Sequence, residues 1–417
     1  MSDSTPHAPP RRAALIFIFI TILLDMLAMG MIIPVLPKMI VNFLSGDTAR
    51  AAEILGVFST VWALMQFIFS PLVGALSDRF GRRPVVLMSN FGLGLDYILM
   101  ALAPTLGWLF AGRVIAGITS ASISTASAYI ADVTPPEKRA ASFGMLGAAF
   151  GIGFIMGPAV GGVLGELNPR LPFWVAAILS LSNAMYGLFV LPESLPPERR
   201  KAFRWQRANP MGALALLRSK SEVLGLASVN FLYHLAHIAL TSVFVLSGSY
   251  RFGWTERTVG LTMAGVGLSS MVVQAGLVRP TVKRLGERRA LLLGLSFGAV
   301  GFCIYGLAET GIVFWLGVPV MALWGLTGPS SQGLMSRHIS PSEQGQLQGA
   351  LSSLMGIAGM IGPGLFTQIF ARAIDPQRGW HLPGAPFLLA SLLLVFAQLL
   401  AWHVTRQRVE VAVAPMT

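Results

Sequence analysis

The sequence is dominated by apolar stretches of about 20 residues, each long enough to cross the hydrocarbon core of a bilayer as a helix. Because lipid offers no hydrogen-bond partners to the backbone, such stretches fold as transmembrane helices. Twelve spans are expected, at residues 13–36, 53–75, 84–103, 107–131, 140–165, 172–191, 222–248, 257–279, 289–308, 311–334, 345–370 and 385–404. The sequence therefore predicts an all-α integral membrane protein with twelve transmembrane helices.

The basic residues follow the same pattern of spans. The chain has 30 lysines and arginines against 18 acids, and in a soluble protein a net charge of +12 would point to nucleic acid. Most of the basic residues lie in alternate loops, on the side that also holds both ends of the chain, which is the positive-inside pattern. We therefore expect no nucleic-acid partner, both termini in the cytoplasm, and a multi-pass protein of the bacterial cytoplasmic (inner) membrane.

The chain offers little for catalysis or cofactor binding. Its single cysteine, Cys303, lies within a predicted span and has no disulfide partner. No nucleophile–base pair, metal constellation or phosphate-binding loop is recognisable. We therefore expect a monomer that is not an enzyme, binds no cofactor or metal, and has the lipid bilayer, protons and a small-molecule substrate as its partners.

The second half of the chain repeats the first. Residues 78–83 align with residues 283–288, an offset of 205 positions, and Gly157-Pro158 aligns with Gly362-Pro363 at the same offset. Internal repeats of this kind are common in transporters. The predicted organisation is an N-terminal six-helix half (1–191), a cytoplasmic linker (192–221) and a C-terminal six-helix half (222–417).

The loop after the second span combines turn-forming glycines with an acid and several arginines. Glycine permits tight backbone turns, and an acid can pair with arginines or meet a helix N-terminus. We interpret the loop as a conformational latch, although the arginines could also serve topology alone. The latch residues are Gly74, Asp78, Arg79, Gly81, Arg82 and Arg83.

The fifth span is rich in small residues at helical spacing. Such residues let neighbouring helices approach closely, and a proline within a helix removes a backbone donor. Ordinary close packing would explain the same pattern. The residues of this glycine motif are Gly147, Gly151, Gly157, Pro158 and Gly161.

Two acids and one arginine fall inside predicted spans. An ionised carboxylate at the centre of a bilayer costs about 2.5–3.5 kcal/mol on insertion scales, so Asp25 and Asp96 need a reason to be there. Either they form a static ion pair with Arg113, or they bind a proton during part of a transport cycle. Two acids against one arginine favour proton coupling through these three residues.

Polar side chains at helical spacing indicate the faces that line a cavity. Arg113, Ser120 and Ser124 share one face of the fourth span, and Asn230, His234 and His237 share one face of the seventh. The serines could equally serve helix packing. The imidazoles could bind substrate, carry protons, or hydrogen-bond to the backbone. The candidate substrate-binding residues are Gln66, Ser120, Ser124, Asn230, His234, His237 and Gln274.

Several of these motifs resemble those of a known family. The loop of residues 74–83 is similar to the signature loop of the major facilitator superfamily, and the glycine-rich fifth span resembles a motif of its antiporters. Residues 24–37, 77–84, 95–97 and 251–254 look like the bacterial tetracycline/proton antiporters. This resemblance implies the major facilitator fold, and it implies transport roles for Asp25, Gln66, Asp96 and Arg113.

The second half departs from that antiporter pattern. Alignment by neighbouring residues puts Ser270 and Gly298 where those exporters carry a histidine and an aspartate. The function that we expect is proton-coupled efflux of a drug-like amphipathic solute, with tetracycline as one possible substrate. Solute uptake by proton symport or facilitated diffusion on the same fold is the alternative, because a fold alone does not fix the direction of transport.

Overall fold

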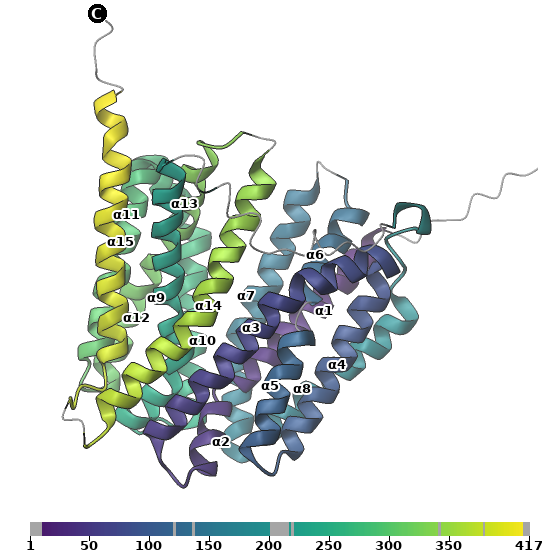
Figure 1. Ribbon diagram of the computed structural model, residues 1–417, viewed down its shortest axis with the longest axis horizontal. Helices are drawn as coiled ribbons and strands as arrows, with labels where there is room; N and C mark the ends of the chain where they lie inside the picture. Colours follow the sequence, from purple (N-terminus) through teal and green to yellow (C-terminus); the bar gives the residue numbers. More distant parts are fainter. Residues whose placement is uncertain are drawn as a thin grey trace, which may run out of the picture. The chain divides into compact units, whose positions relative to one another are not determined.

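The computed structural model describes residues 11–119, 122–135, 138–200, 217, 221–340, 343–377 and 380–411 (Figure 1). Every regular element within these ranges is a helix. The chain divides into two compact units, which are described separately below. The first comprises Met1–Val35 and Met65–Asn209, and the second comprises Leu36–Leu64 and Pro210–Thr417.

The helices of both units have lengths suited to a membrane protein. Those of the first unit are α1 (Arg11–Ile32), α4 (Arg82–Leu102), α5 (Leu106–Thr119), α6 (Ser122–Val133), α7 (Arg139–Leu167), α8 (Leu171–Val190) and the short η2 (Pro197–Arg199). Those of the second are α2 (Leu36–Phe43), α9 (Ser221–Phe252), α10 (Glu256–Val272), η5 (Val273–Leu277), α11 (Val278–Leu307), α12 (Gly311–Ala322), η6 (Leu323–Leu326), α13 (Thr327–Ser336), α14 (Gln344–Ile374) and α15 (Ala385–Val411). The long helix α3 (Thr48–Phe80) contributes to both units.

Ten helices in the described ranges are long and apolar enough to cross a membrane, against twelve spans expected from the sequence. The difference has two sources. The predicted span 107–131 is present as the shorter helices α5 and α6, on either side of two residues outside the described ranges. The predicted spans 257–279 and 289–308 lie in one run of helix, Glu256–Leu307, which turns at Gly286 between them.

Prolines and positive-φ glycines set the breaks between helices. The first predicted span, 13–36, ends as a helix at Ile32 because Pro34 lacks a backbone donor and disfavours helical geometry in the preceding residue. Gly286, inside α11, has a non-helical φ of 78°. Gly81, 205 positions earlier, has a φ of 108° immediately before α4. Both angles lie in the region that only glycine adopts readily.

The cores of the two units differ in composition. In the first unit α1 packs on α6 and α7, and Phe17, Ile18 and Tyr129 are fully buried there. In the second unit aromatic rings cluster at one end of α11. Tyr305 and Phe314 stack there with ring centroids 3.9 Å apart and planes 6° from parallel.

Arg251 caps the end of α11. Its guanidinium donates to the carbonyl oxygens of Tyr305 at 2.7 Å and Gly306 at 3.0 Å, and it also contacts that of Ala308. The last carbonyls of a helix lack intrahelical partners, so a cation there satisfies them and opposes the helix dipole. The 251–254 motif therefore serves the structure of this end of the unit.

Polar contacts join residues 36–64 to the rest of the second unit, and Lys38 makes two of them. Its ammonium pairs with Glu256, at the start of α10, at 3.2 Å and donates to the carbonyl oxygen of Trp254 at 2.8 Å. In the same unit Thr60 on α3 donates to the carbonyl oxygen of Met360 on α14 at 3.2 Å. These contacts hold α2 and the first part of α3 against helices from much later in the chain.

Candidate functional site

Two buried acids and an arginine lie together in the first unit. Asp25, midway along α1, is 5% exposed, and Asp96 on α4 is 1% exposed. Tyr97, the neighbour of Asp96, is within electrostatic range of both acids and of Arg113 on α5. Three helices therefore contribute charged side chains to one cluster, and Tyr97, which belongs to the 95–97 motif but is not among the predicted site residues, joins it.

Asp96 and Arg113 interact without a direct ion pair among the described residues. One oxygen of Asp96 lies against α5 at Gly112, where an added Cβ would meet it at 3.0 Å. Neither carboxylate oxygen accepts a hydrogen bond from a described residue, and Arg113 donates to the sulfur of Met100 at 3.5 Å. The Asp96 carboxylate therefore interacts electrostatically with the Arg113 guanidinium but forms no direct ion pair with it.

The glycine motif of α7 separates into two groups. Gly157 and Gly161 face the backbone of α1, and a Cβ on Gly157 would come within 2.7 Å of the Cα of Gly30. Pro158 lies beside the same glycine, 3.0 Å from the position of a Cβ on Gly30. No described atom would lie within 4 Å of a Cβ on the other two glycines, which are Gly147 and Gly151. The later part of the motif therefore holds α7 against the helix that carries Asp25.

Arg82 is the centre of the predicted latch. Its guanidinium binds Asp78 at 2.7 Å and Asp132 at 3.1 Å. It also donates to the hydroxyl of Ser77 at 2.6 Å. Only 11% of the Arg82 side chain is exposed, so this network ties together the ends of α3, α4 and α6.

Glu193 completes this network from beyond α8. Its carboxylate accepts hydrogen bonds from the backbone amides of Arg82 at 2.8 Å and Arg83 at 3.3 Å, the first two residues of α4. A negative charge there satisfies unpaired donors and opposes the helix dipole. Glu193 and Asp132 are 111 and 50 positions from Arg82, and no local pattern in the sequence identifies them.

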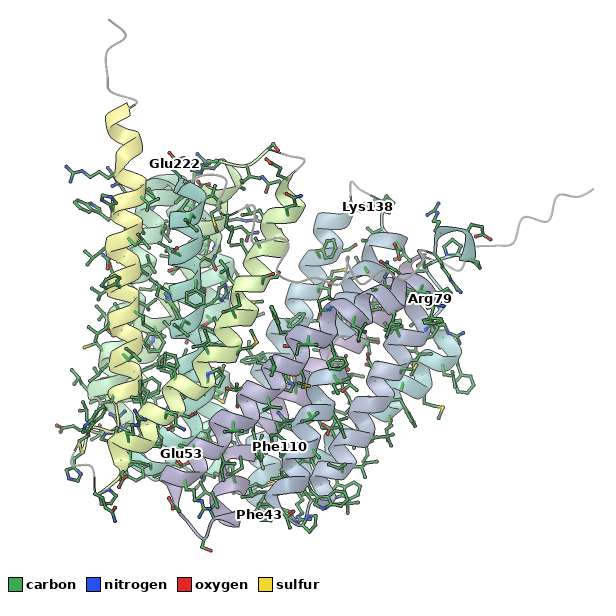
Figure 2. All side chains as sticks on the ribbon, viewed as in Figure 1. Phe43, Glu53, Arg79, Phe110, Lys138 and Glu222 are labelled. Carbon is green, nitrogen blue, oxygen red and sulfur yellow. The ribbon has the colours of Figure 1, made fainter. Side chains whose placement is uncertain are left out.

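The remaining latch residues have smaller roles in this structure. Arg79 is exposed at the end of α3 (Figure 2). Its guanidinium lies over the ring of Phe80, 5.1 Å from the centroid. Arg83 donates to the carbonyl oxygen of Leu188 at 2.6 Å. Gly74 has open space around it, since no described atom would lie within 4 Å of its Cβ.

The second unit contains a matching pair with reversed charges. Glu287 and Arg337 lie 205 positions after Arg82 and Asp132, and their side chains form an ion pair at 2.9 Å. The Arg337 side chain is 66% exposed, whereas Glu287 is 16% exposed. The repeat therefore preserves the contact between these positions and inverts its polarity.

The predicted histidines of α9 lie beside two aromatic residues. The ring of His234 is 5.0 Å from that of Tyr233, and the ring of His237 is 5.5 Å from the indole of Trp324 in η6. Tyr233 and Trp324 are themselves 4.8 Å apart. Trp324 is not among the residues predicted from the sequence, because it follows a uniformly apolar stretch, residues 311–323.

Unsatisfied polar atoms surround this aromatic group. Buried polar groups normally have a hydrogen-bond partner, and those without one are candidates to bind water or a ligand. Among the described residues of α9, η6 and α13, six have a buried side-chain atom without a hydrogen-bond partner: Asn230, Trp324, Thr327, Ser330, Ser331 and, further along α9, Ser247. A solute placed here would meet stacking surfaces together with unused hydrogen-bonding groups.

The other predicted substrate-binding residues are spread over both units. Gln274 is exposed in the π-helical turn η5, and its Cγ lies 3.7 Å from where a Cβ on Gly325 would be. Such turns are frequent at functional sites. Gln66 is half-buried on α3 in the first unit. Ser120 lies outside the described residues, and only the backbone of Ser124 is described.

Gly298 has no room for a side chain. A Cβ there would lie 2.5 Å from Trp324 and 2.8 Å from Leu394. The indole therefore occupies the space into which a longer side chain from Gly298 would project. Ser270, the other position that departs from the antiporter pattern, is half-buried near the end of α10.

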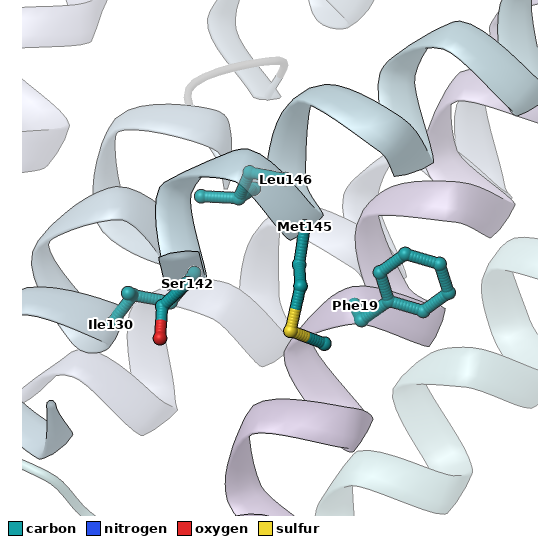
Figure 3. Close-up of a pocket in the computed structure, with 5 residues that line it drawn as sticks. All are labelled: Phe19, Ile130, Ser142, Met145 and Leu146. Atoms are coloured by element: carbon teal, nitrogen blue, oxygen red, sulfur yellow. The ribbon is translucent and has the colours of Figure 1, made fainter. Parts of the chain in front are cut away.

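A small cavity in the first unit is unsuited to a substrate. It has a volume of about 10 Å³ and lies among α1, α6 and α7, where it is lined by Phe19, Ile130, Ser142, Met145 and Leu146 (Figure 3). This volume is close to the minimum for one water molecule, which also needs two to four polar partners. One hydroxyl in an apolar lining does not supply them.

Comparison with known sequences places the chain among transporters. A family model for the Major Facilitator Superfamily matches residues 18–363, with a further match at 252–412. The class C tetracycline resistance protein of Escherichia coli is 38% identical over 385 residues, which cover 90% of this chain and 95% of that protein. The class D protein of Salmonella ordonez is 36% identical over 391 residues, which cover 92% and 97%.

Solved structures with the same fold are also membrane transporters. The human organic anion transporter MFSD10 (TETRAN) matches with a TM-score of 0.69 and 24% identity, over 94% of this chain and all of that one. The nucleoside transporter NupG matches with a TM-score of 0.75 and 15% identity, over 94% and 99%. These similarities confirm the all-α membrane fold that the sequence predicts. Identities this low show the fold alone.

Proposed function

Because the chain belongs to the major facilitator superfamily and is therefore a multi-pass membrane transporter and not an enzyme, we propose that it exports a drug-like amphipathic solute in exchange for protons. The observation that carries this proposal is the 38% identity, across 90% of the chain, to a tetracycline resistance protein. Tetracycline is accordingly the first substrate to test.

Asp25 and Asp96 are proposed to carry the protons. Both are buried in helices that cross the membrane, and Arg113 lies close to Asp96 without a direct ion pair. A carboxyl group that alternates between a buried and a hydrated environment can bind a proton on one side and release it on the other. Each proton that enters the cell contributes about 2.3 kcal/mol per 100 mV of membrane potential.

The aromatic group of the second unit is proposed to hold the solute. The ring of Trp324 lies 4.8 Å from that of Tyr233 and 5.5 Å from that of His237, and aromatic rings stack on flat apolar ligands. The unpaired hydroxyls of α13 and the amide of Asn230 would supply orientation. Gln66, Ser120, Ser124, His234 and Gln274 are proposed as further substrate contacts.

The two halves of the internal repeat are proposed to be the parts that move during transport. The halves 1–191 and 222–417, joined by the cytoplasmic linker 192–221, would move relative to each other and open the substrate site to each side of the membrane in turn, as in other transporters with internal repeats. The predicted latch residues would hold one conformation and release the other. We place both termini in the cytoplasm, the protein in the bacterial inner membrane, and the active form as a monomer.

Everted membrane vesicles test the exchange directly. In vesicles energised to an acidic interior, addition of tetracycline should release protons and drive accumulation of the drug. Asp25→Asn should abolish the proton release while the protein still reaches the membrane. Asp47→Asn is the matched control, because this exposed acid accepts a hydrogen bond from the amide of Arg50 at 2.9 Å, which asparagine can also accept.

Two results would overturn the exchange mechanism. One is an absence of substrate-dependent proton release, and the other is wild-type transport by both Asp25→Asn and Asp96→Asn. Accumulation of a labelled sugar or organic acid by intact cells would instead favour uptake. If tetracycline is not moved, the resistance profile of a drug-sensitive host expressing the gene will identify the transported class.

A further inference from the structure

A groove between α11 and α15 lies away from the proposed transport residues. The two helices run side by side in the second unit (Figure 1). The groove has a volume of about 370 Å³, within the range of small-molecule sites. Its lining is Leu285, Arg289, Leu292, Leu293, Ser296 and Gln398.

The surface around this groove is apolar and accessible. Leu293 and Val300 continue the lined face of α11, at 38% and 51% exposure, and Leu399 and Trp402 flank Gln398 on α15, at 60% and 46%. In a membrane-spanning protein, large apolar side chains that are exposed on neighbouring helices face the lipid acyl chains. The groove is therefore open to lipid along its length.

One end of the groove is strongly basic. Arg289 lines it and forms no hydrogen bond or ion pair with any other described residue. The neighbouring Arg288 donates to Thr405 on α15 at 2.9 Å, and Arg406 lies over the indole of Trp402. The one acid among residues 283–289 is Glu287, which already pairs with Arg337. The positive charge of Arg289 therefore has no counter-ion among the residues that the structure describes.

Two polar side chains, Gln398 and Ser296, lie further along the groove. Gln398 donates one amide hydrogen to the hydroxyl of Ser296 at 2.8 Å. Ser296 is seven positions beyond Arg289, which corresponds to about 10 Å along a helix. The groove therefore presents a cation at its basic end, apolar walls, and an amide about two helical turns further in.

We propose that this groove binds an anionic phospholipid, with the phosphodiester on Arg289, an acyl chain along Leu285, Leu292 and Leu293, and a glycerol ester near Gln398. Basic pockets between transmembrane helices on the cytoplasmic side bind acidic head groups in this way. The cytoplasmic placement of Arg289 rests on the proposed topology. The binding itself requires only lipid contact, so it can be tested whether or not the chain transports tetracycline.

Native mass spectrometry of the full chain in detergent measures this binding. We expect one phosphatidylglycerol to bind about fivefold more tightly than phosphatidylcholine with the same acyl chains, because one arginine contributes about that factor to binding of an anionic lipid. Arg289→Gln should reduce the affinity for phosphatidylglycerol to that for phosphatidylcholine. Arg257→Gln, which removes an equal charge from the exposed start of α10, should leave the preference unchanged.

A second variant tests the shape of the groove independently of the charge of Arg289. Leu293→Trp fills the groove and keeps Arg289, and it should also lose the bound phosphatidylglycerol. Retention of the lipid by Leu293→Trp, or an equal loss in Arg257→Gln, would overturn the proposal. Displacement of the lipid by inorganic phosphate would identify a simple anion site, and displacement by tetracycline would identify a solute site. Either result would also refute the lipid-binding proposal.

Discussion

The coupling free energy between Arg82 and Asp132 should be larger than that between Glu287 and Arg337, the corresponding pair in the second half of the chain. In the first pair the side chains are 11% and 25% exposed, and Arg82 is also held by Asp78 and Ser77. A pair that is largely removed from water is screened little, so we expect a coupling free energy of about 2 kcal/mol.

The Glu287–Arg337 pair has a similar length but a different environment. Its nitrogen–oxygen distance is 2.9 Å, yet 66% of the Arg337 side chain is exposed. Exposed ion pairs contribute about 0–1 kcal/mol, because water and salt screen the attraction and the long side chain loses freedom. We therefore expect a coupling below about 1 kcal/mol here.

Two double-mutant cycles provide the comparison. Each pair is replaced by alanine singly and together, and the free energy of unfolding is measured by titrating the protein from mild detergent into dodecyl sulfate while following tryptophan fluorescence. Arg79→Ala is the control, because this exposed arginine contacts the ring of Phe80 and should contribute about 0.5–1 kcal/mol at most. Equal couplings for the two pairs, or a larger one in the second half, would refute the argument from burial.

The close contact between α1 and α7 predicts that Gly157→Leu abolishes folding and transport, because a Cβ at this position would lie 2.7 Å from the Cα of Gly30. Gly147→Ala should be tolerated, because its Cβ would have open space. Gel filtration measures folding of the two variants, and a transport assay measures their activity. Gly298→Asp should not create a working proton site, because the new side chain would collide with Trp324. We expect this variant to lower the unfolding midpoint and weaken tetracycline binding, and stable, fully active protein would contradict the reasoning.

The spans and the buried acids could be predicted because each is a local property of the sequence. A run of about 20 apolar residues shows a membrane crossing without knowledge of its neighbours. An acid within such a run, as at Asp25 and Asp96, stands out for the same reason. The sequence also separates the spans 257–279 and 289–308 through the charged residues between them, whereas in the structure helix runs through Glu256–Leu307 with a turn at Gly286.

The partners of these residues could not be predicted because they depend on contacts between distant segments. The acid Glu193 caps α4 from 111 positions away. Trp324 contacts the ring of His237 from a helix 87 positions later in the chain, at the end of an apolar run. The glycine motif of α7 is uniform in sequence, yet only its later glycines face α1, because packing partners and not spacing decide which small residues are needed.

The repeat of the latch shows which physical requirement the two halves share. Three charged positions of one half are all inverted in the other: Asp78, Arg82 and Asp132 correspond to Lys283, Glu287 and Arg337. An opposite charge can satisfy the same contact if its partner changes with it, so in the pairs Arg82–Asp132 and Glu287–Arg337 the sign of each charge is free while the pairing is kept. A positive backbone φ has no such substitute, and Gly81 and Gly286 are accordingly the same residue. The glycine is therefore the more reliable marker of this loop in a distant repeat. The charged residues whose sign is inverted identify the loop only when both members of an ion pair are compared.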